Sequence, residues 1–586
     1  MRAVSDTPVE PQGLPKPVSP AASPAPVAPP VPAPPPAPTP PPGPADPAHP
    51  VAPDHPVAPD HAASPRRPAG PTDLTDLTDP AELAELAELG ELAGIGARFG
   101  TPLYVLDLER LRANVAGLAR ALAPDTPLYS LKTNHLPAVT EVVRAGGFGV
   151  DVVSGYELRA ALRAGFAPER IVFNGPVKTP EELRTAVAHG VFVNIDGEEE
   201  IDALAAAAAG RGRPLPVGLR VFPPHDVYAG PPPLPDRQTP SKFGWPLATG
   251  DADRLVEAVR RRPELRLTGL HCHLGSQITS VPALLAALSA VVDWVATRCT
   301  GLPLEVLNLG GGFGVPGIQR IKGALAGLSQ VRAAAVEPEA PERFEPAQLA
   351  SGVRKLLAER GLSQLRVCWE PGRAVVSDAM TLLTRVAAVK RTAVGTWVLL
   401  DGGLNLLPTA GVAERHHYRA LRREAPDASF FLGGPLCYEG DVFSLDARLP
   451  ADVRRGDFIA VRDAGAYSTT RATSFNRPRA AVVAVQRGRA ELVWRAETDE
   501  DIFRFAVPQR GAADTRPATA APRADAGAPW TDAAGPRADA PGQRADAAGP
   551  RADAAAQRPA VADRTRGPQP GCAPPFPPFL RPEESR

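Results

Sequence analysis

The feature that most limits the fold of this sequence is an alternation of strand-like and helix-like segments, repeated eight times between residues 128 and 370. The strand-like segments are short apolar runs, which are typical of strands buried on both faces of a parallel sheet. They cover residues 128–132, 149–153, 171–174, 192–195, 217–222, 267–273, 304–309 and 365–370. Eight such units favour an α/β fold with a closed (β/α)8 barrel of the TIM type. The alternative is a doubly wound open sheet, which does not need eight units.

Helix-like intervals separate these runs, among them residues 136–144, 156–163, 180–189 and 198–208. The longest apolar interval, residues 281–297, is barely long enough to span a bilayer and contains Asp293 and Trp294. We therefore expect it to be a buried helix between two strands. The sequence predicts no membrane segment.

The rhythm changes after Arg373, where strand-like runs follow one another without helices between them. These runs cover residues 381–389, 396–400, 429–432, 441–449, 457–461 and 480–486. They predict a second, β-rich domain of ordinary size. We expect five parts: a tail over 1–77, a helix and strand over 78–107 that join the β-domain, the barrel over 108–373, the β-domain over 374–508 and a second tail over 509–586.

Both tails have compositions that cannot form a packed core. Residues 8–71 are dominated by Pro, Ala and Val, and the segment after Arg510 repeats Pro-Arg-Ala-Asp from Pro522, Pro536 and Pro550. Such segments bury too little apolar surface to offset the entropy lost on ordering. We expect both tails to be disordered.

Charge and cysteine content narrow the partners and the compartment. The net charge of −1 gives no electrostatic reason to bind nucleic acid or an anionic membrane. The five cysteines show no metal or disulfide spacing; they are Cys272, Cys299, Cys368, Cys437 and Cys572. A reducing cytoplasm is the simplest location, and no metal is expected.

Polar side chains end most of the predicted barrel strands. They are Lys132, Asp151, Asn174, Asp196, Arg220, His273, Asn308 and Glu370. In a (β/α)8 barrel the carboxyl ends of the strands carry the active site. A lone lysine at a strand end would usually extend to solvent, but this ring of polar groups favours a functional role for Lys132.

Seven stretches in this order resemble the ornithine/diaminopimelate/arginine decarboxylase family, whose barrel is of the alanine-racemase type (fold type III). The first four are Tyr-Ser-Leu-Lys-Thr-Asn at 129–134, Ser-Lys-Phe-Gly at 241–244, His-Cys-His-Leu-Gly-Ser-Gln at 271–277 and Asn-Leu-Gly-Gly-Gly-Phe-Gly at 308–314. The others are Glu-Pro-Gly-Arg at 370–373, Gly-Pro-Leu-Cys-Tyr-Glu-Gly-Asp at 434–441 and Asp-Ala-Gly-Ala-Tyr at 463–467. The resemblance covers about residues 98 to 500.

The resemblance implies pyridoxal 5'-phosphate as cofactor, joined to Lys132 as a Schiff base. An imine-forming lysine needs a pKa well below the usual value of about 10.4. Asp151 and Arg220 would be polar supports near this lysine. The cofactor's phosphate would be held by Gly310, Gly311, Gly312, Ser276 and Tyr467.

The resemblance also assigns groups to the cofactor ring. His273 would stack on it, and Glu370 would face the pyridine nitrogen and keep it protonated, which makes the ring a full electron sink. Arg373 would contact phosphate or substrate. His271 is interpreted as a core histidine.

A loop of the β-domain carries the remaining candidates. By the resemblance, Cys437 reaches across a homodimer interface into the partner's site and helps to protonate the product. Tyr438, Glu439 and Asp441 share that loop and are candidate substrate contacts, the two acids for an amine.

The substrate-binding half departs from the family's diaminopimelate decarboxylases. The glutamate that holds the distal amine is replaced by Tyr438, and the arginine and tyrosine that hold the distal carboxylate by Leu407 and Gly411. Asn308 replaces an aspartate. A buried carboxylate without a cationic partner loses a charge-assisted bond, so meso-diaminopimelate is not the expected substrate.

We therefore expect a pyridoxal-phosphate-dependent decarboxylase that acts on a basic or modified amino acid. The alternatives are a racemase of the same fold and a non-catalytic homologue that binds the cofactor. Glu370 disfavours a racemase, because racemases of this type favour an arginine at the pyridine nitrogen. Retention of Lys132, His273, Glu370 and Cys437 disfavours loss of catalysis.

Overall fold

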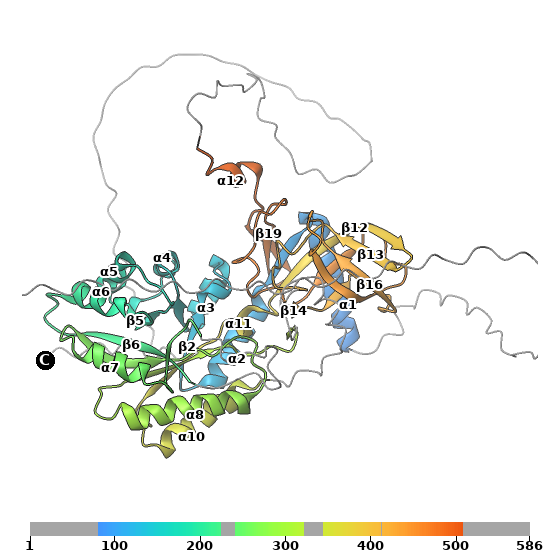
Figure 1. Cartoon of the computed structure of the whole chain (residues 1–586). Coiled ribbons are helices and arrows are strands. Elements are labelled where there is room, and N and C mark those ends of the chain that lie inside the picture. Colours follow the sequence, from blue (N-terminus) through green and yellow to red (C-terminus); the bar gives the residue numbers. More distant parts are fainter. Residues whose placement is uncertain (1–79, 224–240, 321–343, 412, 508–586) are drawn as a thin grey trace, which may run out of the picture. The chain divides into compact units, whose positions relative to one another are not determined.

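A computed structural model of the chain describes residues 80–223, 241–320, 344–411 and 413–507 (Figure 1). Both predicted tails, with the Pro-Arg-Ala-Asp repeats and Cys572, lie outside the described residues.

Eight parallel strands close into a barrel. Their order is β5-β4-β3-β2-β11-β9-β8-β6, and the pairing of β5 with β6 completes the ring. The strands are β2 (Thr126–Ser130), β3 (Gly149–Val152), β4 (Ile171–Phe173), β5 (Phe192–Ile195), β6 (Leu215–Phe222), β8 (Leu265–His271), β9 (Val306–Gly311) and β11 (Arg366–Glu370). The closure confirms the predicted barrel and excludes the open sheet. The short β7 (Trp245–Pro246) pairs with β6 beside the ring.

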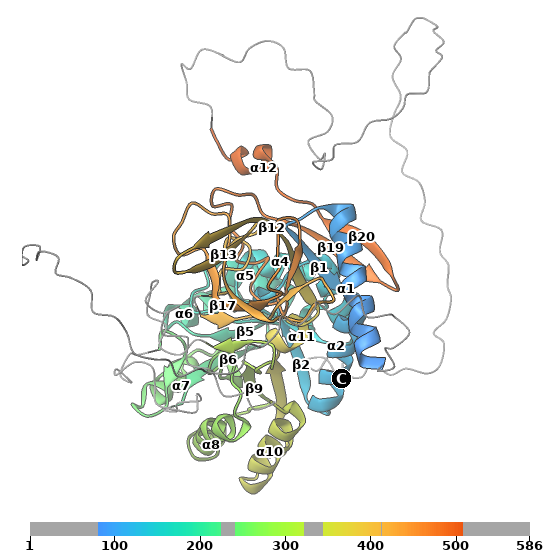
Figure 2. The same ribbon diagram turned by 90° about the vertical axis from the view of Figure 1, so that its right-hand side faces the viewer.

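Helices alternate with these strands and cover the barrel (Figure 1 and Figure 2). They are α2 (Leu108–Leu122), α3 (Pro137–Ala145), α4 (Gly155–Arg163), α5 (Pro180–His189), α6 (Glu199–Ala208), α7 (Asp251–Arg260), α8 (Val281–Arg298) and α10 (Pro346–Glu359). Short helical turns are η2 (Leu131–Thr133), η3 (Pro168–Arg170) and α11 (Arg373–Val376). In α5, Thr179 and Glu182 form a capping box and Gly190 ends the helix in a left-handed conformation. Local sequence therefore fixes both ends of this helix.

Among the described residues, α8 is the one helix long and apolar enough to span a membrane by length and composition. In the barrel its residues Leu284, Leu288, Val291 and Val292 are buried in the main hydrophobic core. The helix also packs beside α10 (Figure 1). Its apolar character is accounted for by this packing.

The second sheet contains the strands that follow the barrel and one that precedes it. Its strands are β1 (Leu103–Asp107), β12 (Met380–Thr392), β13 (Gly395–Leu400), β15 (Tyr418–Ala420), β16 (Ala428–Gly433), β17 (Val442–Leu449), β18 (Phe458–Val461), β19 (Ala481–Gln486) and β20 (Arg489–Trp494). β1 lies between β12 and β19, and α1 (Pro80–Phe99) packs against this sheet through Leu92 and Ile95. Outside the two large sheets, β10 (Gln319–Arg320) pairs with β14 (Glu414–Arg415), and α12 (Asp499–Phe503) follows β20.

Strand register brings the polar strand ends together. His271 of β8 lies opposite Asn308 of β9, and Ser130 of β2 lies opposite Asp151 of β3. A register shift between β9 and β11 sets Glu370 opposite Gly311. Because these positions follow from backbone pairing, their side chains share one end of the barrel.

Candidate active site

Lys132 lies in η2, directly after β2, and points its amine at a buried carboxylate. Its Nζ is 2.8 Å from Asp151 Oδ2 and 2.6 Å from Ser130 Oγ. Burial lowers the pKa of Lys132, but the carboxylates of Asp151 and Glu370 raise it by more, so its net shift is upward. The expectation of a lowered lysine pKa is therefore wrong for the chain by itself, because the ammonium is ion-paired.

Glu370 is fully enclosed by hydrogen-bond donors at the end of β11. Asn174 Nδ2 and Asn308 Nδ2 donate to its Oε1 at 2.6 and 2.7 Å, and His271 Nε2 is 3.3 Å from Oε2. Burial raises the pKa of Glu370, but His271 and the Lys132 ammonium lower it by more, to well below its usual value. The carboxylate is thus held ionised and in one orientation.

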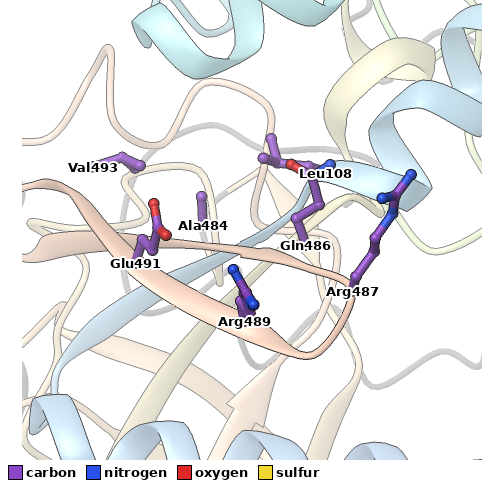
Figure 3. A pocket seen from close by; sticks show the side chains of 7 residues that line it. All are labelled: Leu108, Ala484, Gln486, Arg487, Arg489, Glu491 and Val493. Carbon is purple, nitrogen blue, oxygen red and sulfur yellow. The ribbon is translucent and has the colours of Figure 1, made fainter.

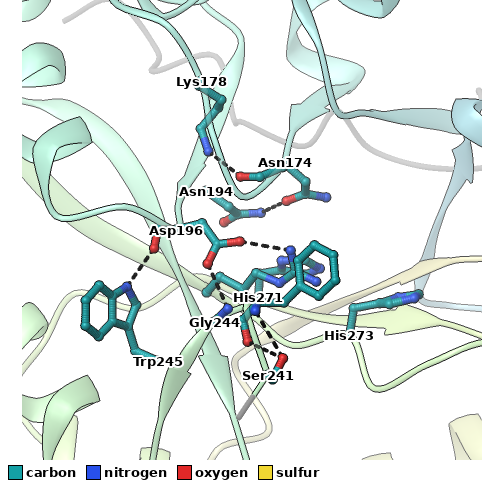
Figure 4. Close-up of polar contacts among 12 residues, drawn as sticks. Asn174, Lys178, Asn194, Asp196, Ser241, Gly244, Trp245, His271 and His273 are labelled. Carbon is teal, nitrogen blue, oxygen red and sulfur yellow. Dashed lines mark hydrogen bonds and ion pairs between the residues drawn. The ribbon is translucent and has the colours of Figure 1, made fainter. Parts of the chain in front are cut away.

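Asn174 connects the Asp151 carboxylate, which contacts Lys132, to the Glu370 carboxylate. Asn174 Nδ2 is 2.6 Å from Asp151 Oδ1 as well as from Glu370 Oε1. Asn194 Nδ2 in turn donates to Asn174 Oδ1 at 2.7 Å, as Figure 4 shows. The amide network therefore fixes the relative positions of the carboxylates near Lys132.

His273 and the glycine run lie beside this network. The backbone N–H of Gly311 donates to His273 Nδ1 at 3.1 Å, and Gly310 N–H donates to Asn308 Oδ1 at 3.0 Å. Burial and the nearby Lys132 ammonium lower the pKa of His273, which keeps its ring neutral. A Cβ on Gly311 would lie 2.0 Å from the carbonyl oxygen of Glu370, so only glycine allows this approach.

Arg373 begins α11 and meets the β-domain. Its guanidinium lies 5.3 Å from the ring centroid of Tyr467, and its Nη2 is ion-paired with Glu414. The backbone N–H of Tyr467 donates to the carbonyl oxygen of Thr133 at 2.9 Å. Arg373 and Tyr467, both predicted phosphate contacts, are therefore neighbours next to Lys132.

Arg220 is ion-paired with Asp196, and its expected role as a polar support near Lys132 stays a prediction. Its Nη1 is 2.9 Å from Asp196 Oδ2, and the other oxygen of Asp196 accepts from the backbone N–H of Gly244 at 2.7 Å (Figure 4). Trp245 Nε1 donates to the Asp196 carbonyl oxygen at 2.8 Å. Of the two predicted supports, Asp151 contacts Lys132. Arg220 contacts Asp196, which also binds the backbone N–H of Gly244, so this carboxylate links β6 to the Ser241–Gly244 stretch.

The loop at 434–441 contains both exposed and buried candidate residues. Cys437, Tyr438 and Glu439 are exposed, whereas both oxygens of Asp441 accept backbone N–H groups, from Leu404 at 2.7 Å and Leu436 at 2.8 Å. Asp441 thus braces its loop, and its contact with a substrate amine stays a prediction. Ser276 is half-buried in the segment after β8, and its role as a phosphate donor also stays a prediction.

A pocket of about 590 Å³ lies elsewhere, at the hairpin of β19 and β20 (Figure 3). Its lining consists of Leu108, Ala484, Gln486, Arg487, Arg489, Glu491 and Val493. It contains none of the predicted site residues. Size alone does not make it the chemical site, because it lacks the convergent buried titratable groups that surround Lys132.

Several residues of the site were missed from the sequence, among them His271 and Glu414. His271, the last residue of β8, contacts Glu370 although it was interpreted as a core histidine; its position two residues before His273 was the available signal. Glu414 was not singled out, although it closely follows the Leu407–Gly411 segment. The pairing of β10 with β14 that accompanies Glu414 had no recognisable sequence pattern.

These side chains fit pyridoxal phosphate. The cofactor needs a lysine amine, a carboxylate for its ring nitrogen and donors for its phosphate. Lys132 and Glu370 supply the first two. Arg373 Nε and Nη1 are buried without a hydrogen-bond partner among the described residues, which leaves two donors for an anion beside Tyr467.

Comparison with known proteins agrees with this geometry. The family model for the pyridoxal-binding domain of pyridoxal-dependent decarboxylases matches residues 108–377. Diaminopimelate decarboxylase of Actinosynnema pretiosum is 37% identical over 426 residues, covering 70% of this chain and 90% of that protein, and that of Bacillus subtilis is 33% identical, covering 71% and 93%. The crystal structure of diaminopimelate decarboxylase from M. jannaschii superposes with a TM-score of 0.62 at 27% identity, covering 71% and 94%. The chain therefore belongs to the family of pyridoxal-dependent decarboxylases that includes the diaminopimelate decarboxylases, and it is an amino-acid decarboxylase that depends on pyridoxal phosphate.

Proposed function

We propose that this enzyme removes the α-carboxylate of an amino acid other than meso-diaminopimelate, as a homodimer with shared active sites. The observation that carries the chemistry is the Glu370 carboxylate held by Asn174, Asn308 and His271. The proposed choice of substrate rests on Leu407 and Gly411, which stand where the resemblance expects an arginine and a tyrosine that hold a distal carboxylate.

Lys132 and Asp151 form the nucleophile and its base. The Lys132 ammonium must lose a proton before the amine can attack a carbonyl carbon, and Asp151 Oδ2 at 2.8 Å is within reach of that proton. Ser130 and Asn174 hold this carboxylate from two sides. The arrangement fixes where the amine points.

Glu370 favours decarboxylation over racemisation. When bound, pyridoxal phosphate supplies a ring that accepts the electron pair left on Cα after CO2 departs. Glu370 keeps its negative charge because donors surround it, and so can hold a proton on the ring nitrogen. His273, with a neutral ring, can lie against the cofactor without repelling its protonated nitrogen.

The segment that would bind a distal carboxylate lacks the arginine and the tyrosine expected to hold that group. Gly411 has φ of +69°, and a Cβ there would lie 2.0 Å from the carbonyl oxygen of Val442, so the present backbone excludes a tyrosine. Leu407 is fully buried in the hydrophobic core, where an arginine would lose its hydration. Both positions support a substrate without the diaminopimelate distal carboxylate.

Exposure around Cys437 supports the shared site. Tyr438 is 61% exposed and Phe475 51% exposed, and their rings pack edge to face at 6.4 Å next to the exposed thiol. Exposed aromatic side chains of this size are enriched at protein interfaces. In the proposed dimer the partner covers them, and Cys437 donates a proton to Cα of the product in the partner's site.

Product analysis tests the proposal. The purified enzyme with pyridoxal phosphate is incubated with lysine, ornithine, arginine, glutamate and meso-diaminopimelate, and CO2 and amine are measured. We expect meso-diaminopimelate to react at least about 10²-fold more slowly than the best substrate, because a distal carboxylate finds no cation. Efficient formation of lysine from meso-diaminopimelate would refute the substrate proposal, and conversion of L- into D-amino acid without CO2 would refute the reaction.

A further inference from the structure

We propose that Glu414 and His416 form the subsite for the distal end of the substrate, and that this end donates an N–H hydrogen bond and carries no negative charge. The inference rests on the proposed function and names the substrate class of that same site. Neither residue was among the candidates taken from the sequence.

Glu414 neutralises the one arginine that the resemblance brings to the substrate. It begins β14, opposite Arg320 of β10, and its Oε1 pairs with Arg373 Nη2. The side chains are only 5% exposed for Arg373 and 9% for Glu414. At the Glu414 end of this pair a substrate anion would meet a carboxylate, while Arg373 Nε and Nη1, which lack a hydrogen-bond partner among the described residues, stay available to an anion beside Tyr467.

Two buried acceptors face each other next to this pair. Glu414 Oε2 and His416 Nε2 are 3.9 Å apart, and neither has a hydrogen-bond partner among the described residues. His416 Nδ1 is 2.9 Å from the Arg462 carbonyl oxygen, which can only accept, so Nδ1 carries the hydrogen. Burial lowers the pKa of His416 and keeps the ring neutral, which leaves Nε2 as an acceptor.

Two unpaired acceptors require a donor. A buried polar atom without a partner costs free energy, and native proteins satisfy almost all such atoms. An ammonium between Glu414 and His416 could donate one hydrogen to each acceptor, and an amide N–H could donate to one of them or be shared by both. A carboxylate would be repelled by both, and a methyl group would leave both unpaired.

The subsite borders the catalytic cluster. The Arg373 guanidinium that contacts Glu414 also lies against the Tyr467 ring, and Tyr467 N–H is bonded to Thr133, the residue after Lys132. These contacts connect the segment that carries Lys132 to Glu414 through Thr133, Tyr467 and Arg373. A substrate whose Cα lies at Lys132 would extend its side chain toward Glu414.

Two kinds of distal group have the required N–H, namely a free ammonium and an amide. Four ligands of one chain length separate them from the rest: L-lysine with an ammonium, Nε-acetyl-L-lysine with an amide N–H, L-norleucine with a methyl group and L-2-aminoadipate with a carboxylate. Ornithine, its Nδ-acetyl derivative, norvaline and glutamate repeat the set one methylene shorter. Decarboxylation by the holoenzyme is measured together with the change in the cofactor's visible spectrum on binding.

We expect one of the two N–H ligands to exceed both the methyl and the carboxylate ligand by about tenfold or more in kcat/KM, since hydrogen bonds to a charged acceptor are among the stronger ones. Which N–H ligand is better then identifies a free or an acylated amine. Equal rates for the methyl ligand, a preference for the carboxylate ligand, or no response to either N–H ligand at both lengths would overturn the inference. Failure to release CO2 from any amino acid would instead refute the proposed function.

Substitutions test whether Glu414 and His416 cause the preference for an N–H ligand. Glu414→Gln should remove most of the difference between the N–H and methyl ligands and raise the relative rate of the carboxylate ligand, because Arg373 loses its partner. His416→Gln, which leaves the ion pair in place, should reduce the same difference and provides a second variant if Glu414→Gln does not fold. Glu141→Gln, at an exposed position of α3, is the matched control and should keep the wild-type ranking. An unchanged ranking in both folded test variants would contradict the subsite.

Discussion

The cofactor end of the barrel and the adjoining edge of the β-domain differ in how completely their buried carboxylates are paired. In the barrel, Asp151 and Glu370 are each held by two or more side-chain donors. At the β-domain edge, Glu414 Oε2 and His416 Nε2 lie buried without partners, and Cys437 is exposed. The Asp151 and Glu370 carboxylates are satisfied within one chain, whereas the β-domain edge is, in our proposals, completed by substrate and a second subunit.

The difference has a structural origin. The barrel residues lie at strand ends, where the pairing of β8 with β9 and of β9 with β11 sets their positions. The β-domain residues lie in loops and short strands, whose positions are set less strictly by strand pairing. Under the proposed function, the chain keeps the chemistry of its family while its substrate-binding groups differ.

The largest effect is expected when one residue is replaced in each of the two regions. Lys132→Ala and Cys437→Ala should each lower turnover by roughly 10³-fold, since each removes a group that handles a proton or bond in the reaction. Mixed in equal amounts under conditions of subunit exchange, the two inactive variants should recover about a quarter of the wild-type activity, because half of the dimers have one intact site. Activity of the mixture and subunit exchange are measured in parallel.

No recovery despite demonstrated exchange would place Cys437 and Lys132 in the site of a single subunit. Sedimentation of the wild type as a monomer with full activity would contradict the shared site directly.

A smaller effect tests the completeness of the cofactor end. Asn308→Asp replaces a donor to Glu370 with a second carboxylate, which raises the pKa of Glu370 and loses a buried hydrogen bond. We expect turnover to fall about tenfold and the free energy of unfolding to fall by about 1–3 kcal/mol at pH 7. The exposed Asn476→Asp is the control for the added charge.

The pH dependence of this loss has a definite sign. The folded chain holds the pKa of Glu370 below its ordinary value of 4.5, so the stabilisation is present above that pH and is lost as the pH falls. The deficit of Asn308→Asp in melting temperature should therefore be largest at neutral pH and shrink below about pH 4.5. A deficit that grows on acidification would contradict the role given to Asn308.

The sequence predicted the barrel well because its strands are apolar runs with regular spacing, a local pattern that reports burial directly. It also predicted Lys132, Asp151, Asn308 and Glu370, since residues at the carboxyl ends of parallel strands must share one end of a barrel. Arg373 and Glu414 do not belong to one sequence motif, so no motif predicts their contact. The bracing of Asp441 by Leu404 and Leu436 likewise depends on backbone geometry that a residue pattern does not contain.

The barrel end that contains Asp151 and Glu370 is expected to hold the cofactor on Lys132. The most direct measurement is reduction of the holoenzyme with borohydride, followed by digestion and mass spectrometry of the peptides. We predict that the added pyridoxyl mass is found on the peptide containing Lys132. Lys178, which Figure 4 shows near Asn174, is a competing buried lysine. Its Nζ is ion-paired with Glu200 at 2.9 Å. The added mass on Lys178, or on no lysine despite bound cofactor, would contradict the account.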